Sequence, residues 1–130
     1  MDKAAVRQMG ALTLAYIGDS VYDIYVRRDL IEKAPNMPAH GLHRQASRIV
    51  CAAGQARAAH HILDRLTEEE MAVFRRGRNA NHATVPKHAD MADYRAATGL
   101  EALLGALYLM GETERLSELL TYTKESWEET

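Results

Sequence analysis

The chain has little of what marks several large protein classes. Its 130 residues include a single cysteine, Cys51, so no disulfide can form within the chain and multi-cysteine zinc sites are excluded. No run of about 18 uncharged apolar residues occurs, and the first ten residues lack the apolar segment of a secretory signal. These absences predict a soluble protein of the reducing cytoplasm, with no membrane span.

Proline, glycine and aromatic residues are also scarce, at 3 prolines, 8 glycines and 6% aromatic residues. No segment of strand length alternates β-branched or aromatic residues with polar ones. Residues that favour helices, such as Ala, Leu, Arg, Glu and Met, are abundant. The length and the 47% apolar content are those of one globular domain. We therefore predict a single compact all-α domain over residues 1–130.

Net charge is small as well. The formal value of −2 argues against a uniformly basic nucleic-acid-binding protein. The distribution is uneven, however, because residues 1–98 carry 14 basic and 11 acidic side chains, whereas residues 99–130 carry 2 and 7. Basic residues occur without any acidic one over residues 33–63 and again over residues 71–87. A polarised nucleic-acid-binding protein, with the acidic final helix facing away from the ligand, fits this pattern.

Apolar periodicity predicts the helices. The expected helical segments are about 10–33, about 39–66 with a break or bend at Gly54, 67–77 with a Thr67/Glu70 capping box, 90–110 ended by Gly111, and a last helix whose apolar face is Leu116, Leu119, Leu120, Thr123 and Trp127. The 10–33 segment is apolar nearly all round, which predicts a central buried helix. Cys51 is expected to be a small core residue, and residues 78–89 form a loop.

Two carboxylates interrupt the most apolar helices. Asp19 follows Gly18, and Glu101 lies between Gly99 and Gly105 as the only charged residue from 98 to 110. Unpaired buried carboxylates are costly, and helical glycines favour close packing. We expect the two helices to pack together and their acids to meet. The pair is then either structural, bonded to arginine or to a helix N-terminus, or a site for Mg²⁺, which prefers hard oxygen ligands.

The residues around both acids resemble a known family. A-Y-I-G-D-S-V-Y-D at 15–23 is similar to the E-x-L-G-D-A/S-V/I-L signature of the ribonuclease III catalytic domain. T-G-L-E-A-L-L-G-A-L-Y-L at 98–109 is similar to its second motif, D-x-x-E-A-L-I-G-A-x-Y-L. The whole chain, with R-R-G-R-N-A before the second motif and no double-stranded-RNA-binding domain after it, resembles the short bacterial form, mini-ribonuclease III.

The match is incomplete at the family's acidic positions, which correspond to Ala15, Asp19, Thr98 and Glu101. Two of the four acids are absent, so we expect fewer protein ligands for each metal ion, more water in the coordination shell and weaker metal binding. The number of metal ions per site stays open. Asp23, one helical turn from Asp19, is a candidate for an outer role at the site.

The resemblance implies a Mg²⁺-dependent endoribonuclease that hydrolyses phosphodiesters of double-stranded RNA, with Asp19 and Glu101 as catalytic metal ligands and Mn²⁺ as a possible substitute. It also implies maturation of the ends of precursor 23S ribosomal RNA, in the cytoplasm, by a two-fold homodimer. The dimer interface is expected to include Leu12 and Tyr16 of the first long helix. Whether a ribosomal protein presents the substrate is left open.

Affinity for RNA comes mainly from phosphate neutralisation. The basic and polar residues predicted to bind RNA are Arg44, Arg48, Arg75, Arg76, Arg78, Asn79 and Lys87. Arg44 and Arg48 share the helix face opposite the Leu42/Ala46/Ile49 stripe, but a solvated face explains them equally well. Arg75 and Arg76 could instead complement a helix macrodipole. The loop containing Arg78, Asn79 and Lys87 is the strongest candidate for groove contact, and deleting residues 79–86 should abolish cleavage.

Two other functions compete with this interpretation. His60, His61 and Asp64, with His88 and Asp90, suggest an HD-type metal phosphohydrolase, although the wider spacing of that ligand set is absent. The loss of two acids suggests a non-catalytic RNA-binding or ribosome-assembly scaffold. Mg²⁺-dependent cleavage of duplex RNA, with EDTA as the control, distinguishes a scaffold from an enzyme.

Overall fold

The computed structural model describes residues 1–81 and 90–127, and over these residues the secondary structure is entirely helical. The helices, in chain order, are α1 (Lys3–Gln8), α2 (Ala11–Lys33), α3 (Ala39–Val50), α4 (Ala52–Ile62), the 3₁₀ turn η1 (Leu63–Arg65), α5 (Glu68–Arg78), α6 (Met91–Met110) and α7 (Thr113–Lys124). The predicted all-α class is confirmed. None of the described helices is long and apolar enough to span a membrane.

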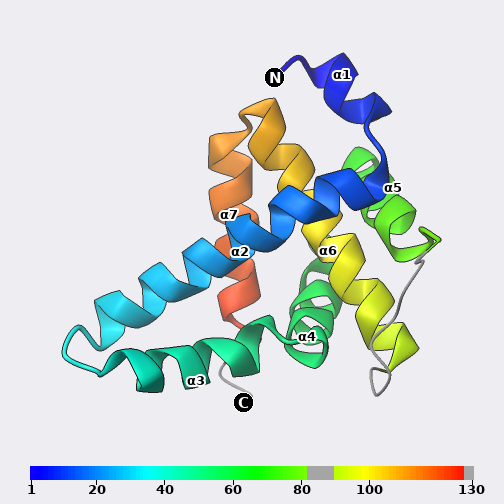
Figure 1. Ribbon diagram of the computed structural model, residues 1–130. Coiled ribbons are helices and arrows are strands. Elements are labelled where there is room, and N and C mark those ends of the chain that lie inside the picture. Colours follow the sequence, from blue (N-terminus) through cyan, green and yellow to red (C-terminus); the bar gives the residue numbers. More distant parts are fainter. Residues whose placement is uncertain (82–89, 128–130) are drawn as a thin grey trace.

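Helix α6 is the centre of the bundle. It contacts α1, α2, α4, α5 and α7, and α2 crosses it (Figure 1). Eleven of the twelve residues from Ala96 to Leu107 are buried, and the half-buried Glu101 is the exception. Because α6 is covered on all sides, its apolar sequence is explained by burial within this chain.

The predicted ends of several helices are confirmed. Thr67 and Glu70 form the reciprocal capping box at the start of α5, and Asp90 caps α6. Gly111 ends α6 with a left-handed φ of 75°, a conformation that glycine adopts without steric cost. Helix α5 ends at Arg78, slightly later than predicted. Four of the five residues predicted for the apolar face of the last helix are buried, namely Leu116, Leu119, Leu120 and Thr123, whereas Trp127 lies beyond the end of α7 and is half-buried.

The prediction that α2 is buried all round is wrong for the single chain. One side of α2 packs on the core through residues such as Leu14, Tyr22 and Val26. The opposite side exposes large apolar residues, with Tyr16 82% and Ile24 68% accessible to solvent. An amino-acid pattern that is apolar all round shows that both faces of a helix avoid water, but not which of them is covered by the same chain.

The junction of α3 and α4 also differs from the prediction. The break falls at Cys51, which is extended, exposed and accepts a hydrogen bond from the Gly54 amide as the N-cap of α4. Cys51 is therefore a capping residue and not a core residue. Gly54 lies inside α4, where a side chain would collide with the carbonyl oxygen of Ile49 at 2.3 Å. Ala53, predicted to continue the apolar stripe of α3, is exposed in the first turn of α4.

Helix α1 was not predicted from the sequence. It is held by the fully buried side chain of Val6 and by Arg76 of α5, whose guanidinium donates to the carbonyl oxygens of Arg7 and Met9. An ion pair joins Lys3 to Glu112 at the start of α7. The segment thus covers one end of α6 through one apolar anchor and several polar contacts.

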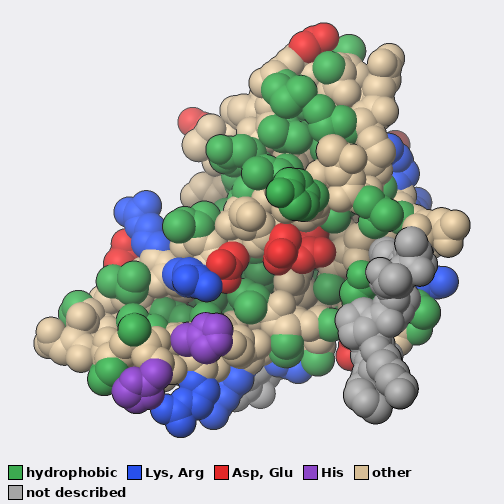
Figure 2. All heavy atoms as spheres, viewed as in Figure 1, with side chains coloured by type: hydrophobic (Ala, Val, Ile, Leu, Met, Phe, Trp, Pro, Cys, Tyr) green, Lys and Arg blue, Asp and Glu red, His purple; other side chains and the backbone are tan. Residues whose placement is uncertain are grey.

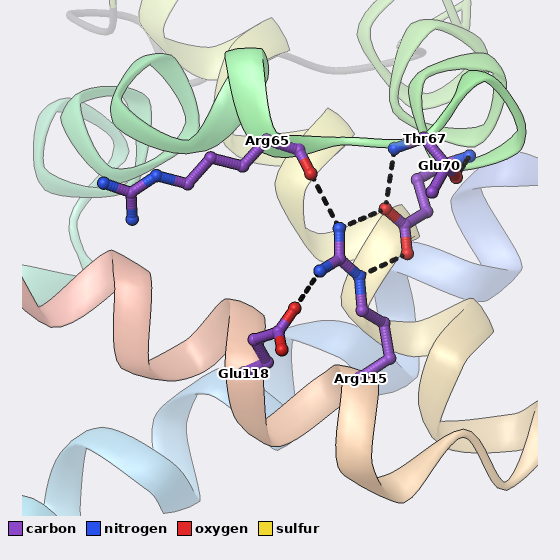
Figure 3. Close-up of polar contacts among 5 residues, drawn as sticks. All are labelled: Arg65, Thr67, Glu70, Arg115 and Glu118. Carbon is purple, nitrogen blue, oxygen red and sulfur yellow. Dashed lines mark hydrogen bonds and ion pairs between the residues drawn. The ribbon is translucent and has the colours of Figure 1, made fainter.

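A partly buried ion pair joins α5 to α7 (Figure 3). The Arg115 guanidinium donates from Nε to Glu70 Oε2 at 2.9 Å and from a terminal nitrogen to Glu70 Oε1 at 2.8 Å, a bidentate arrangement. Arg115 also donates to the Arg65 carbonyl oxygen and pairs with Glu118. Hydrogen bonds from Arg115 hold the pKa of Glu70 below its usual range, against the opposing effect of burial. This contact fixes the start of α5 and the course of α7.

Candidate active site

The site forms where α2 and α6 touch backbone to backbone. A Cβ atom placed on Gly18 would lie 1.7 Å from the Glu101 carbonyl oxygen, and one placed on Gly105 would lie 2.0 Å from the Leu14 carbonyl oxygen. Each glycine therefore admits the backbone of the other helix, as the sequence predicted for these two positions. Gly99 has a different role, because it packs against Phe74 of α5.

The crossing brings Asp19 and Glu101 together. Asp19 follows Gly18 on the exposed side of α2, and Glu101 is half-buried on α6. Burial raises the pKa of Glu101 to about 8, and the nearby Asp19 carboxylate contributes through its charge and a hydrogen bond. The predicted meeting of the two acids is therefore present, and at neutral pH Glu101 favours its protonated form.

A third polar residue, which sequence reasoning missed, lies at the pair. Gln55 of α4 is buried and donates from Nε2 to Glu101 Oε2 at 3.3 Å. The same nitrogen donates to the Val50 carbonyl oxygen at 2.9 Å, at the end of α3. The sequence offers only a weak signal that Gln55 belongs to the site, because Gln55 is a single amide side chain inside an alanine-rich helical segment.

The charges of the two acids are not balanced by any of the described residues. Within residues 1–81 and 90–127, neither Asp19 nor Glu101 forms an ion pair with lysine, arginine or histidine. The structural alternative, in which arginine satisfies both acids, is thus not realised by the described side chains. Two carboxylates that repel each other, partly out of water and open on one side, fit a divalent cation such as Mg²⁺. The described residues include no cluster of three His, Cys, Asp or Glu side chains placed to hold a metal ion, so water would supply the remaining ligands.

The two family positions that lack acids supply no carboxylate to the site. Ala15 is buried, and the Thr98 hydroxyl donates to the Tyr94 carbonyl oxygen within α6. Asp23 is half-buried and pairs with Arg27 at 3.0 Å along α2. These placements agree with the expectation of few protein ligands.

The histidines of the HD-type alternative do not gather. His61 Nε2 lies 2.8 Å from Glu125, a surface carboxylate that Arg65 also contacts. His60 and Asp64 are exposed, and His88 lies outside the described residues. In the part of the chain that the structure describes, nothing supports an HD-type centre.

Basic side chains flank the acids on the same face of the molecule. Figure 2 shows carboxylates close to the crossing of α2 and α6, and basic and histidine side chains along α3. Arg44 and Arg48 of α3 are exposed and line a shallow surface pocket with His40, between the start of α3 and the preceding loop. Arg75 of α5 is also exposed.

The other residues predicted to contact RNA are less free. Arg76 is engaged with the carbonyl oxygens of α1 and would have to release them to reach a phosphate. Arg78 lies over the Phe74 ring, 5.9 Å from its centroid, and donates to Asn79. Asn79 is exposed at the end of α5. Lys87, and most of the 79–86 segment whose deletion was considered, lie outside the described residues.

Comparisons with known proteins agree with the geometry. The model of the ribonuclease III domain matches residues 12–112. A mini-ribonuclease 3 of Symbiobacterium thermophilum is 52% identical over 84% of this chain and 83% of the relative, and one of Thermoanaerobacter sp. is 43% identical over 99% and 90%. A crystal structure of a protein from Fusobacterium nucleatum superimposes with a TM-score of 0.81 at 25% identity, covering 92% of this chain and 95% of the other.

Proposed function

The chain belongs to the ribonuclease III family and is an endoribonuclease that cleaves double-stranded RNA, and we propose that Asp19 and Glu101 are its catalytic residues. The observation that carries this proposal is the pair itself. Two acids from different helices meet at a glycine crossing with no cation beside them among the described residues. Stability alone would favour replacing at least one of them.

Asp19 and Glu101 would hold a divalent cation, which we propose to be Mg²⁺ with Mn²⁺ as a substitute. When bound, such a cation lowers the pKa of a coordinated water and neutralises charge on the phosphate. The chain's contribution is to hold both carboxylates at a fixed separation through the backbone contact of α2 and α6. Glu101 must be ionised to bind the cation, so its raised pKa means that binding releases a proton near neutral pH.

The basic face supports the choice of substrate. A-form duplex is recognised mostly through its shape, its phosphates and its 2′-hydroxyl groups. Arg44 and Arg48 are exposed on α3, which contacts α2 and ends beside Gln55. We propose that α3 contacts the phosphates of the strand being cut. Arg75, Arg78, Asn79 and Lys87 are proposed to extend this surface on the other side of the site.

A homodimer is proposed from the exposed side of α2. Leu12, Tyr16, Ile24 and Ile31 are large apolar side chains that face solvent in the single chain. Several large apolar side chains exposed along one helix are typical of protein interfaces. A second copy of the chain across a two-fold axis would cover it and would place two sites on one duplex. Tyr16→Glu should convert the dimer to a monomer in sedimentation equilibrium, and a wild-type monomer at micromolar concentration would contradict the proposal.

The biological substrate is proposed to be precursor 23S ribosomal RNA, processed in the cytoplasm, with a ribosomal protein as a possible presenting partner. The support is the resemblance of the two sequence motifs to mini-ribonuclease III, the name carried by relatives that are 52% and 43% identical to this chain. Cleavage of the naked precursor stem can be compared with cleavage of the same stem in a pre-ribosomal particle. Equal cutting of unrelated duplexes and of this stem in both settings would count against a dedicated substrate.

The test of the site is Mg²⁺-dependent cleavage of a duplex RNA by purified protein, with EDTA as the control. We expect cleavage in Mg²⁺ or Mn²⁺, none in EDTA, and almost none with Glu101→Gln. Glu118→Gln is the matched control, because it removes a surface carboxylate of α7 that lies outside the acid pair. Cleavage that survives Glu101→Gln would place the site elsewhere, and duplex binding without cutting by the wild type would favour the scaffold alternative.

A further inference from the structure

Gln55 is a buried polar residue in an otherwise small and apolar segment. Only 3% of it is exposed, and its neighbours Gly54, Ala56, Ala58 and Ala59 are buried as well. Its Nε2 bridges two acceptors on different parts of the fold, the Val50 carbonyl oxygen at 2.9 Å and Glu101 Oε2 at 3.3 Å. The side chain therefore joins the end of α3 to the proposed catalytic carboxylate on α6.

The orientation of this amide follows from its partners. The Val50 carbonyl oxygen can only accept a hydrogen bond, so the nitrogen of the amide must face it, and the same nitrogen reaches Glu101 Oε2. Both amide hydrogens are then in use. Rotation of the amide by 180° would place two oxygen atoms against each other at Val50, which excludes the alternative.

The other end of the amide is left without a partner. Gln55 Oε1 is buried and accepts no hydrogen bond from the described residues. A buried acceptor without a donor costs about 1–3 kcal/mol of stability. An apolar side chain of the same length would avoid this cost, so fold stability does not explain a glutamine here. The contact with Glu101 does.

We propose that Gln55 is a positioning residue, whose amide is anchored on Val50 and holds the Glu101 carboxylate in the orientation that binds the divalent cation. This inference rests on the proposed role of Asp19 and Glu101. A glutamate side chain has several rotatable bonds, and each rotamer that must be frozen on binding costs affinity. A donor that already fixes one carboxylate oxygen removes part of that cost and leaves the rest of the carboxylate available.

The main test is Gln55→Met, which keeps the length of the side chain and removes the donor. Mn²⁺ alone is the probe, and its binding is measured by water-proton relaxation. Loss of a group that orients a metal ligand typically costs 10–100-fold in affinity, so we expect the Mn²⁺ dissociation constant to rise by about 10-fold or more. Cleavage should fall at low Mn²⁺ and recover in part as Mn²⁺ is raised, which a folding defect would not do.

Three further variants separate positioning from stability. Ile62→Val trims the core side of the same helix, where Ile62 is 1% exposed, and should leave Mn²⁺ affinity within twofold of wild type. Gln8→Met makes the same substitution at an exposed position of α1 and should change neither the Mn²⁺ affinity nor the cleavage rate. Gln55→Asn retains an amide but is too short to bridge both acceptors. If Gln55→Met does not fold, the Mn²⁺ affinity of Gln55→Asn is the test of the proposal.

The possible results distinguish the role of Gln55 from the proposed metal site at Asp19 and Glu101. Unchanged Mn²⁺ affinity in folded Gln55→Met or Gln55→Asn, beside a wild type that binds Mn²⁺ and cleaves duplex RNA, overturns the role of Gln55 alone. A wild type that cleaves without binding Mn²⁺ at Asp19 and Glu101, shown by normal Mn²⁺ binding in Glu101→Gln, overturns the metal site and the inference together.

Discussion

Glu101 and Glu70 are the same residue type in two opposite surroundings. The Glu70 carboxylate accepts a bidentate pair of hydrogen bonds from Arg115 and one from the Thr67 backbone amide, and its pKa is lowered. Glu101 faces another carboxylate, receives one hydrogen bond from Gln55, and its pKa is raised to about 8. One acid is satisfied by the fold, while the other is held where the fold leaves its charge uncompensated.

This difference separates a structural carboxylate from a functional one by measurable properties. An acid that is paired within the fold contributes to stability and has no unbalanced charge for a ligand to neutralise. An uncompensated acid costs stability, and an added cation would recover that cost. Substitutions at the two sites should therefore act in opposite directions on activity and on stability.

The largest effect is expected from removing the charge of Asp19. Asp19→Asn should reduce the cleavage rate by about 10³-fold or more, because loss of a metal ligand removes several kcal/mol of transition-state stabilisation. The fold should be at least as stable as wild type at pH 8 without metal, because the repulsion with Glu101 is gone. Single-turnover cleavage and thermal unfolding measure the two quantities. Cleavage by Asp19→Asn at a rate close to that of wild type would show that Asp19 is not a functional carboxylate.

Removing Arg115 should give the converse result. Arg115→Met leaves Glu70 without its partner, and because the pair is only partly buried we expect a loss of about 2–3 kcal/mol of unfolding free energy, below the about 3–5 kcal/mol typical of a fully buried pair. Cleavage per folded molecule should be close to that of wild type, because Arg115 lies on α7 and contacts neither acid of the site. Urea unfolding and active-site-normalised rates test this.

A matched control for Arg115 is Arg28→Met on α2. Arg28 forms an exposed ion pair with Glu32 one turn away, and such pairs contribute only about 0.3–0.5 kcal/mol. A loss of stability equal to that of Arg115→Met would show that burial and bidentate geometry are not what matters at Glu70.

The smallest effect is a pair of opposite pH dependences in metal-free buffer. The pKa of Glu101 is raised in the folded protein, so its contribution to stability is complete at acid pH and is lost as pH rises from about 4.5 to about 8. The pKa of Glu70 is lowered, so its contribution is present above about pH 4.5 and is lost as pH falls below that value. Unfolding of Glu101→Gln should lack the first trend, and unfolding of Arg115→Met should show a weaker second one. Identical profiles for all three proteins would refute the assigned charge states.

Much of this site was predictable because its signals are local. A lone acid next to a glycine in an apolar helix is visible in the sequence at Asp19 and at Glu101, and the capping residues Thr67 and Asp90 mark helix starts. The remaining contacts depend on how distant segments pack. Arg115 and Glu70 are 45 residues apart, and Gln55 meets Glu101 across a similar separation, so no spacing rule finds them.

Three of the errors have different physical causes. Helix α1 has six residues and one buried side chain, Val6, which is too short for apolar periodicity to be recognised. The exposed face of α2 was predicted to be buried because a face that avoids water by binding a partner and one that packs inside the chain have the same composition. Cys51 was misplaced for a third reason, since cysteine is usually buried and here caps a helix instead.

The crossing at Gly18 and Gly105 has a consequence for redesign of the enzyme. Because the two backbones touch, the spacing of the acids is set by main-chain atoms and cannot be adjusted by exchanging neighbouring side chains. Directed evolution of sequence preference would then be expected to collect its changes along α3 and α5, while both glycines stay unaltered in every active clone.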